Sequence, residues 1–285
     1  MRKNKERDII KFMNILKKHK KKIIVILIIT AISARCISCE LNARFAPDWK
    51  RQDISETLEK ESLNEKDYTF LFSQTGLGKD AIDDLIKSGN KAKIYDFSEQ
   101  YFEKPEYKKD FMLFPFIATE QKTDSLTEIA PLRDGDILIS LTTYTMGYRH
   151  GHAGIVVNGK TGRTVEHTVF GERSDYGNAD TWREYTTFAV LRYKDSDIAK
   201  KAAEYAEENL IGIFYTPLAG FFKKDKQDEN PVSSSMCSHL VWQAYIAVGA
   251  DIDGDGGNLV MPSDFLKCPD LEIVQIYGID PERAS

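Results

Sequence analysis

Two runs rich in β-branched residues, 152–157 and 164–169, flank the short loop 158–162, which reads Asn-Gly-Lys-Thr-Gly. Asparagine and glycine favour the tight turns that fold a strand back on its neighbour, so this segment predicts a β-hairpin. The two strands of a hairpin are antiparallel, and the chain is therefore expected to build an antiparallel sheet. Further strands, each short and apolar, are expected at 137–141, 187–193 and 271–277.

Helices are predicted between and after these strands. Ser196 can cap a helix that runs to Leu210, and Gly212 would end it. Another helix is expected to begin at Cys237, because apolar residues recur with a 3.6-residue period at positions 240, 241, 244, 245 and 248. Strands and helices together predict an α+β fold.

The charge of the chain is unevenly distributed. The 285 residues have a net charge of −5, but residues 1–22 alone carry ten Lys and Arg against two acidic residues, so the remainder is at −13. A domain this acidic repels the phosphates of nucleic acid, and we expect no nucleic-acid partner. With 42% hydrophobic residues, the chain suits one or two globular domains with a sizeable core.

The first 39 residues are predicted to be a signal peptide or a membrane anchor. The basic segment 17–22 runs directly into the apolar segment 23–32, which is the order of a secretory signal. This apolar run is short for a transmembrane helix, which needs about 20 residues. Cys39 follows as a candidate for lipidation, although no small-residue lipidation motif precedes it. We expect an exported protein of the cell envelope or membrane, with the leader cleaved, lipidated or retained as an anchor.

Residues 40–130 are predicted to form a mostly helical N-terminal extension, and residues 131–285 a catalytic domain. The extension begins with a polar linker at 40–65, and a helix is expected around 81–86. At Pro131 the pattern changes to short strands and turns. The extension can cap a site on the second domain, or it can be a purely structural addition.

Two segments resemble ligand-binding loops, but each lacks a residue that the loop requires. The segment 75–79 resembles a phosphate-binding loop, yet Asp80 stands where Ser or Thr is required, so a helix start after a glycine turn is the better prediction. The segment 251–256 resembles the start of a calcium loop, yet Pro262 occupies the position of the bidentate Glu. We therefore expect an acidic surface turn there, and no metal or cofactor.

Cys237 would lie in the first turn of its helix. Unsatisfied backbone N–H groups and the helix dipole favour a thiolate at this position, and the same N–H groups can hold the oxyanion of a tetrahedral intermediate. The alternative is a buried cysteine that acts as a small hydrophobic residue. Position alone supports the two interpretations about equally. Cys268 could also pair with Cys237, which would block the nucleophile.

His152 begins the first strand of the hairpin and is the candidate base. If 158–162 is a five-residue loop, residue 157 pairs with 163, and Gly154 pairs with Glu166. Glu166 then lies diagonally from His152 on the same face, about 7–8 Å away at the backbone. A glutamate side chain can span that gap and orient the imidazole.

Three other histidines are weaker candidates. A one-residue shift of the hairpin register would place His167 on the face of His152 in place of Glu166. His150 lies in a predicted loop, and His239 follows Cys237 by two residues, so it should point elsewhere on the helix.

Several short motifs occur in a fixed order. They are Asp-Gly-Asp-Ile-Leu at 134–138, His-Ala-Gly-Ile-Val at 152–156, Val-Glu at 165–166, Gly-Ile-Phe-Tyr at 212–215, Cys-Ser-His-Leu-Val-Trp at 237–242 and Met-Pro-Ser-Asp-Phe-Leu at 261–266. As a set they resemble the YiiX/YebB-like group, the circularly permuted papain-like cysteine hydrolases of the NlpC/P60 superfamily. The resemblance covers residues 131–278. Ordinary NlpC/P60 peptidases place Cys before His, so the reverse order here indicates permutation.

The resemblance implies a circularly permuted papain-like fold, with an antiparallel sheet packed against the Cys-bearing helix. It also implies a triad of Cys237 as nucleophile, His152 as base and Glu166 as the residue that orients His152. The reaction implied is hydrolysis of an amide or peptide bond through an acyl-enzyme, with a peptide or acyl-amide substrate such as a cell-wall peptide. Tyr215 and Ser238 would line the pocket or hold the oxyanion.

Two other functions stay open. The permuted papain group includes lecithin-retinol-acyltransferase-like enzymes, and the run that begins at Cys237 has a faint likeness to their Cys-Glu-His motif, which would suit a lipid acyltransferase or lipid-ester hydrolase. A surface-binding domain that kept the fold without catalysis is the other. The sequence does not determine the scissile bond or the oligomeric state.

Overall fold

We describe the protein from a computed structural model. The structure describes residues 44–112, 117–145, 148–168, 171–216, 219 and 232–283, with four isolated positions before residue 42. Residues 43–285 form one compact unit and residues 1–42 another. Cys39 and most of the predicted leader lie outside the described residues. In the described part of the chain, no helix combines the length and the apolar character that crossing a bilayer requires.

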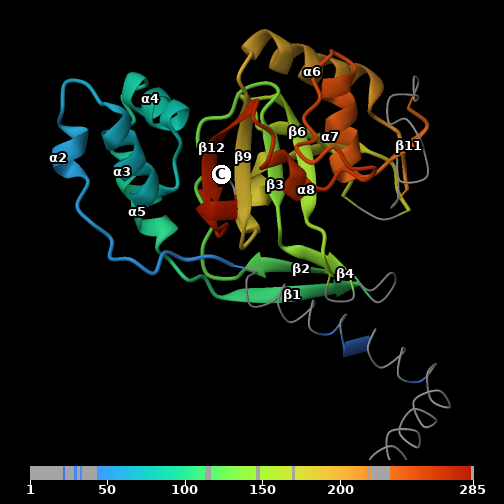
Figure 1. Cartoon of the computed structure of the whole chain (residues 1–285), viewed down its shortest axis with the longest axis horizontal. Coiled ribbons are helices and arrows are strands. Elements are labelled where there is room, and N and C mark those ends of the chain that lie inside the picture. Colours follow the sequence, from blue (N-terminus) through green and yellow to red (C-terminus); the bar gives the residue numbers. More distant parts are fainter. Residues whose placement is uncertain are drawn as a thin grey trace, which may run out of the picture. The chain divides into compact units, whose positions relative to one another are not determined.

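A six-stranded sheet forms the centre of the compact unit (Figure 1). Its order is β12-β9-β3-β6-β7-β8, and every neighbouring pair is antiparallel. The strands are β3 (Ile137–Ser140), β6 (His152–Asn158), β7 (Arg163–Glu166), β8 (Asp175–Asn178), β9 (Phe188–Tyr193) and β12 (Leu271–Tyr277). The antiparallel sheet and the α+β class predicted from the sequence are confirmed.

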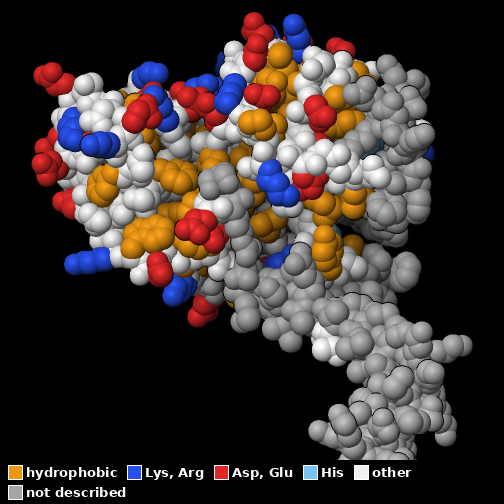
Figure 2. Space-filling view, in the orientation of Figure 1, with side chains coloured by type: hydrophobic (Ala, Val, Ile, Leu, Met, Phe, Trp, Pro, Cys, Tyr) orange, Lys and Arg blue, Asp and Glu red, His pale blue; other side chains and the backbone are white. Residues whose placement is uncertain are grey.

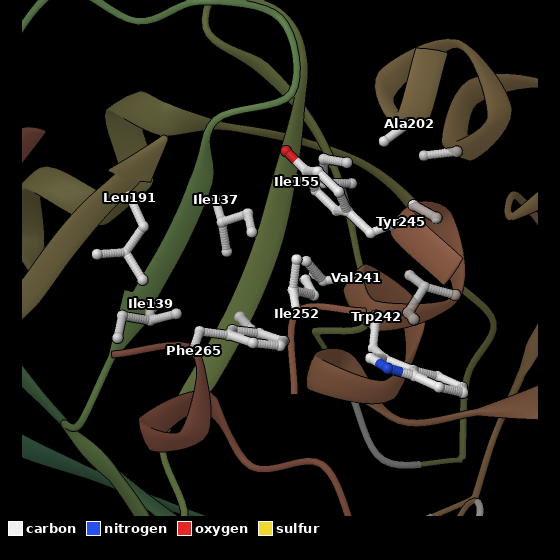
Figure 3. Close-up of a cluster of buried hydrophobic side chains, with 14 of the residues drawn as sticks. Ile137, Ile139, Ile155, Leu191, Ala202, Val241, Trp242, Tyr245, Ile252 and Phe265 are labelled. Carbon is white, nitrogen blue, oxygen red and sulfur yellow. The ribbon is translucent and has the colours of Figure 1, made fainter. Parts of the chain in front are cut away.

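Both faces of this sheet are buried. Successive side chains of a strand point to opposite sides of the sheet, and helices pack against each side. Ile137, Ile139 and Ile155 point toward α6 (Ser196–Asn209) and α7 (Cys237–Ile246), and pack there with side chains of both helices (Figure 3). Leu138 and Val156 point to the other face, toward helices from the first part of the unit. Two buried faces explain why the strands read as continuous apolar runs rather than as an alternation.

Within residues 44–112, four helices precede the sheets: α2 (Ser55–Leu58), α3 (Glu65–Thr75), α4 (Lys79–Lys87) and α5 (Lys93–Tyr101). The Asn64 side chain caps α3, and Gly76 ends it in the left-handed conformation at φ 67°. The helix predicted around 81–86 is confirmed as α4, which follows this glycine turn. The helices and the sheet share one core, to which both contribute through Leu71, Ile82, Phe97 and Val190.

A second antiparallel sheet lies beneath the central one in Figure 1. In the order β1-β2-β4-β5, it contains β1 (Tyr107–Met112), β2 (Ile117–Lys122), β4 (Thr143–Thr145) and β5 (Tyr148–Arg149). The hairpin β1–β2 was not predicted within the extension, whose helices end at residue 101. Glu120 on β2 is buried and binds Arg149 at 2.7 Å and Arg44 at 2.5 Å. These ion pairs tie the second sheet to the segment that precedes the helices.

The remaining elements are short. They are η1 (Ala179–Glu184), the parallel pair β10 (Phe214–Tyr215) and β11 (Ser234–Ser235), α8 (Pro262–Phe265) and η2 (Pro281–Arg283). Two predicted boundaries are wrong. Asp195, not Ser196, caps α6, because its carboxylate accepts hydrogen bonds from the N–H groups of residues 197 and 198. The strand predicted at 164–169 ends at Glu166.

Acidic and basic side chains alternate over α4 and α6 on the face shown in Figure 2. Beneath this surface, Arg192 on β9 makes two hydrogen bonds of 2.8 Å with the buried carboxylate of Asp136. The same guanidinium lies 3.2 Å from Asp80 on α4. Arg133 extends the network to Asp84, at 2.7 Å. The network holds α4 to the central sheet.

Candidate active site

Cys237 is the first residue of α7 and is buried, with 8% of its surface exposed. The preceding residue, Met236, is extended, and no side chain caps the helix. The thiol therefore lies among the backbone N–H groups of a first helical turn. Cys237 and Cys268 are both free thiols, so the disulfide that would block the nucleophile is not formed.

The hairpin register brings His152 and Glu166 together. Gly154 pairs with Glu166, as predicted, and His152 Nε2 lies 2.6 Å from Glu166 Oε2. The predicted pairing of residue 157 with 163 is wrong, because Asn158 pairs with Arg163 and the register shifts by one residue between Val156 and Asn158. A β-bulge thus shortens the loop without moving the pair that matters.

The carboxylate of Glu166 has further partners. Thr164 Oγ1 donates to Glu166 Oε1 from two residues earlier on β7, and Trp182 Nε1 donates to the same oxygen at 3.3 Å. The indole of Trp182 also stacks on the imidazole of His152. A Cβ atom at Gly177 on the neighbouring strand β8 would lie 2.1 Å from Glu166 Oε1. Glu166 is therefore buried and closely packed, with His152, Thr164 and Trp182 as hydrogen-bond partners and Gly177 in close approach.

Opposite charges stabilise one another in this buried group. Burial disfavours the imidazolium, but hydrogen bonds and charges of Cys237 and Glu166 raise the pKa of His152 to about 10. Burial also disfavours the thiolate, but His152 and the backbone N–H groups of Ala153 and Ser238 bring the pKa of Cys237 below its usual value. Burial disfavours the carboxylate form of Glu166, but the hydrogen bond and the charge of His152 favour it. The net effect lowers the pKa of Glu166. An imidazolium and a carboxylate are the favoured forms at neutral pH, and the lowered pKa of Cys237 shifts its thiol toward the thiolate.

A cleft of about 310 Å³ opens onto Cys237 and His152. The second sheet contributes to the wall of this cleft through Asp110, Phe111, Ile117, Thr119 and Thr143. The phenyl ring of Phe111 is 61% exposed at this wall. The region predicted as an extension therefore supplies part of the cleft wall.

The two predicted pocket residues differ in position. Tyr215 on β10 lines the cleft, and burial together with the Cys237 charge raises the pKa of its hydroxyl. Ser238 does not line it, because its hydroxyl is buried and donates to the backbone oxygen of Val260 at 2.7 Å. What Ser238 offers the thiolate is its backbone N–H.

The remaining histidines occupy different places. His150 and His167 line the cleft beside His152, although β7 ends before His167 and the register does not shift it onto the face of His152. His239 does not line the cleft, and its Nδ1 lies 2.9 Å from Ser235 Oγ.

Trp182, Thr164 and Gly177 were not predicted as site residues. Thr164 could have been found, because residues two apart on a strand share a face and Glu166 was already placed on it. Trp182 and Gly177 carry no comparable local signal. They reach the carboxylate from η1 and β8, elements that only the fold brings beside β7.

The acidic turn predicted at 251–256 lies near α8. Ligand atoms of Asp253, Asp255 and Asp264 lie within 4.8 Å of one another. The ammonium group of Lys267 lies 3.0 Å from Asp264 and 3.8 Å from Asp255, so a cationic side chain already offsets part of this charge. The expected absence of a metal or cofactor stays a prediction.

The thiol, imidazole and carboxylate at the head of an open cleft can act as a nucleophile with a base and its orienting group. A scan against models of protein families and a search of curated proteins both find no match to this chain. The function of the protein is therefore inferred from its sequence motifs and from the geometry of the cleft.

Proposed function

We propose that the protein is an exported thiol hydrolase of the circularly permuted papain-like, YiiX/YebB-like group, and that it cleaves an amide or peptide bond. The observation that carries the proposal is the chain of contacts from the Cys237 thiol through His152 to Glu166, the last of them 2.6 Å long, at the mouth of a cleft. This is the arrangement of a nucleophile, its base and the group that orients the base.

In the proposed mechanism the thiolate of Cys237 attacks the substrate carbonyl carbon and forms a carbon–sulfur bond. The electron pair of the C=O bond moves to oxygen, where the backbone N–H of Ser238 and the hydroxyl of Tyr215 are the candidate donors. The imidazolium of His152 then protonates the leaving amine as the C–N bond breaks. Glu166 stabilises the charged imidazole throughout.

A thioester on Cys237 remains after the amine leaves. His152, now neutral, takes a proton from a water molecule, and the resulting hydroxide attacks the thioester carbonyl. Collapse of the second tetrahedral intermediate releases the carboxylic acid and restores the thiolate, while His152 keeps the proton. The reaction consumes one water and needs no metal or redox cofactor.

The proposed location is outside the cytoplasm, in the cell envelope or at the membrane, and rests on the basic and apolar segments of residues 1–39. Cys39 is the candidate for lipidation. Cell-wall peptides are accessible substrates at that location.

Competitive alkylation tests the nucleophile. Iodoacetamide should label Cys237 at neutral pH at least about tenfold faster than a free thiol, because a free thiol is only a few per cent thiolate there. Cys268 is the internal control, since burial raises its pKa and it should react more slowly than a free thiol. Equal labelling of the two cysteines would contradict the proposal.

Trapping the acyl-enzyme then identifies the reaction. Cell extract is mixed with the protein, the mixture is quenched in acid, and the mass added to Cys237 is measured. A peptidyl adduct supports amide hydrolysis, whereas a fatty acyl adduct would assign lipid acyl transfer. A Cys237→Ala variant that keeps full cellular function would instead favour a non-catalytic binding domain.

A further inference from the structure

We propose that His167 is a substrate-binding residue that recognises a peptide group beside the scissile bond, so that the enzyme selects peptides over lipid acyl chains. This inference rests on the proposed function and names the residue that decides its substrate class. His167 follows Glu166 directly, just beyond the end of β7, and lines the cleft together with Cys237 and Tyr215.

The ring of His167 is enclosed but has no hydrogen bond. It is 2% exposed, and neither Nδ1 nor Nε2 has a hydrogen-bond partner among the described residues. Its ring packs edge-on against Tyr215, with centroids 5.3 Å apart and an interplanar angle of 87°. Buried polar groups in native proteins are normally hydrogen-bonded, and an exception requires an explanation.

The other described histidines do not share this property. His150 has Thr145 Oγ1 at 2.9 Å from Nε2 and the Gly151 backbone oxygen at 3.0 Å from Nδ1. His152 has Glu166, and His239 has Ser235 Oγ at 2.9 Å. His167 is therefore distinguished both by its place in the cleft and by its lack of partners within the described chain.

His167 is neutral at physiological pH. Burial and the positive charge of His152 lower its pKa to about 4. A neutral imidazole has one N–H donor and one acceptor nitrogen. At this pKa it is a poor general base at neutral pH, and His152 already has Glu166 to orient it. Hydrogen bonding to the substrate is the role that a neutral His167 can fill.

A peptide group matches the N–H donor and the acceptor nitrogen of the neutral imidazole. Its carbonyl oxygen can accept from the imidazole N–H, and a peptide N–H can donate to the other ring nitrogen. A hydrocarbon chain in the same place would leave both nitrogens buried without partners, which costs about 1–3 kcal/mol for each unpaired group. His167 thus has no partner within the described chain, and a peptide substrate can supply one whereas a lipid chain cannot.

A pair of matched electrophiles tests the selection. One probe is a dipeptidyl chloromethyl ketone and the other an alkyl chloromethyl ketone of the same length; intact mass gives the rate at which each alkylates Cys237. The wild-type protein should prefer the peptidyl probe. His167→Leu should lower the ratio of peptidyl to alkyl rates at least about fivefold, the effect of losing one buried hydrogen bond. His167→Gln, which keeps a donor and an acceptor, should restore most of the ratio.

Lys200→Met, on the exposed surface of α6 and outside the cleft lining, is the control and should leave the ratio unchanged. Thermal unfolding gives a second readout. Because His167→Leu removes an unsatisfied polar group at similar volume, it should keep or raise the Tm, whereas a histidine with a structural role would lower it.

The outcomes separate the two proposals. If iodoacetamide labels wild-type Cys237 rapidly and His167→Leu leaves the rate ratio unchanged, the inference fails and the hydrolase proposal stands. A wild-type preference for the alkyl probe also overturns the inference. If wild-type Cys237 reacts no faster than a free thiol, the proposed function fails, and the assignment of His167 fails with it.

Discussion

The imidazole of His152 lies nearly parallel to the indole of Trp182, with ring centroids 5.0 Å apart and an interplanar angle of 19°. The same indole donates its N–H to Glu166 at 3.3 Å. Trp182 is fully buried, so it holds both the base and the carboxylate from one fixed position. In the proposed mechanism it is a positioning residue, which orients the two groups through the ring stacking and the hydrogen bond.

Replacement of Glu166 by Gln should slow amide hydrolysis by about 10²-fold or more, because the amide cannot stabilise the imidazolium. Loss of the carboxylate also lowers the pKa of His152, and the Cys237 thiolate loses part of its stabilisation. Alkylation by iodoacetamide at pH 7 should therefore slow at least about fivefold. Glu172→Gln, at an exposed position six residues after Glu166, is the control and should have no effect. Unchanged alkylation in Glu166→Gln would mean that the carboxylate does not act on the pair.

The rate of alkylation of Cys237 should rise less steeply between pH 7 and pH 9 than that of a free thiol, because its pKa is lowered. A free thiol accelerates roughly 20-fold over the same interval, since its pKa is near 8.5. Hydrolysis should decline as the pH rises through about 10, where His152 loses its proton and can no longer protonate the leaving amine. A pH–rate curve that rises for Cys237 as it does for cysteine would contradict the ion pair.

The same shift affects stability. The folded pKa of His152 is about 10 and lies above its ordinary value of 6.5, so its contribution to the free energy of unfolding is fully present below pH 6.5. It is lost as the pH rises through the folded pKa. Denaturant unfolding at pH 6 and pH 10 measures this loss, which should be smaller in Glu166→Gln.

Gly177→Ala should impair catalysis more than stability. The new Cβ atom would lie 2.1 Å from Glu166 Oε1 and 2.7 Å from Thr164 Oγ1, so the carboxylate must move away from His152. The fall in kcat should approach that of Glu166→Gln, with KM little changed, because the cleft is not altered. Tyr176→Ala, on the preceding exposed position of β8, is the control. Full activity of Gly177→Ala would show that the carboxylate position is not critical.

Arg192→Met should lower the free energy of unfolding by about 3–5 kcal/mol, because it leaves the buried carboxylate of Asp136 without its partner. Asp136→Asn in the same chain should recover part of the loss. Lys200→Met removes an exposed ion pair with Glu204 and should change stability by no more than about 1 kcal/mol. Urea unfolding measures all three, and a loss below about 1 kcal/mol for Arg192→Met would contradict the role given to the network.

Local patterns in the sequence were sufficient for five of the six strands of the central sheet, all except β8, and for one register. The pairing of Gly154 with Glu166 was predicted correctly because a short loop restricts how two strands can align. The bulge at residue 157 was not predicted, since no residue in that apolar run marks it. The α7 start at Cys237 was also correct, because the apolar residues that follow it recur with a 3.6-residue period.

The second sheet was missed for a different reason. In the sequence, β1 and β2 follow the helices and precede the central sheet. Their charged residues give no alternation of polar and apolar positions that a single sequence reveals. Glu120 reads as a surface residue, but the fold buries it between Arg44 and Arg149. The part of the cleft that the second sheet lines therefore could not be predicted from residues 107–122 alone.

By itself, the sequence determined which residues could form a thiol, imidazole and carboxylate group, because those residues lie on one hairpin and one helix start. Only the tertiary structure decided what encloses them: Trp182 against His152, Gly177 against Glu166, and Phe111 in the cleft wall. The reason is physical. Short loops and helical periods act over a few residues, whereas packing around a buried charge joins elements that the chain keeps far apart.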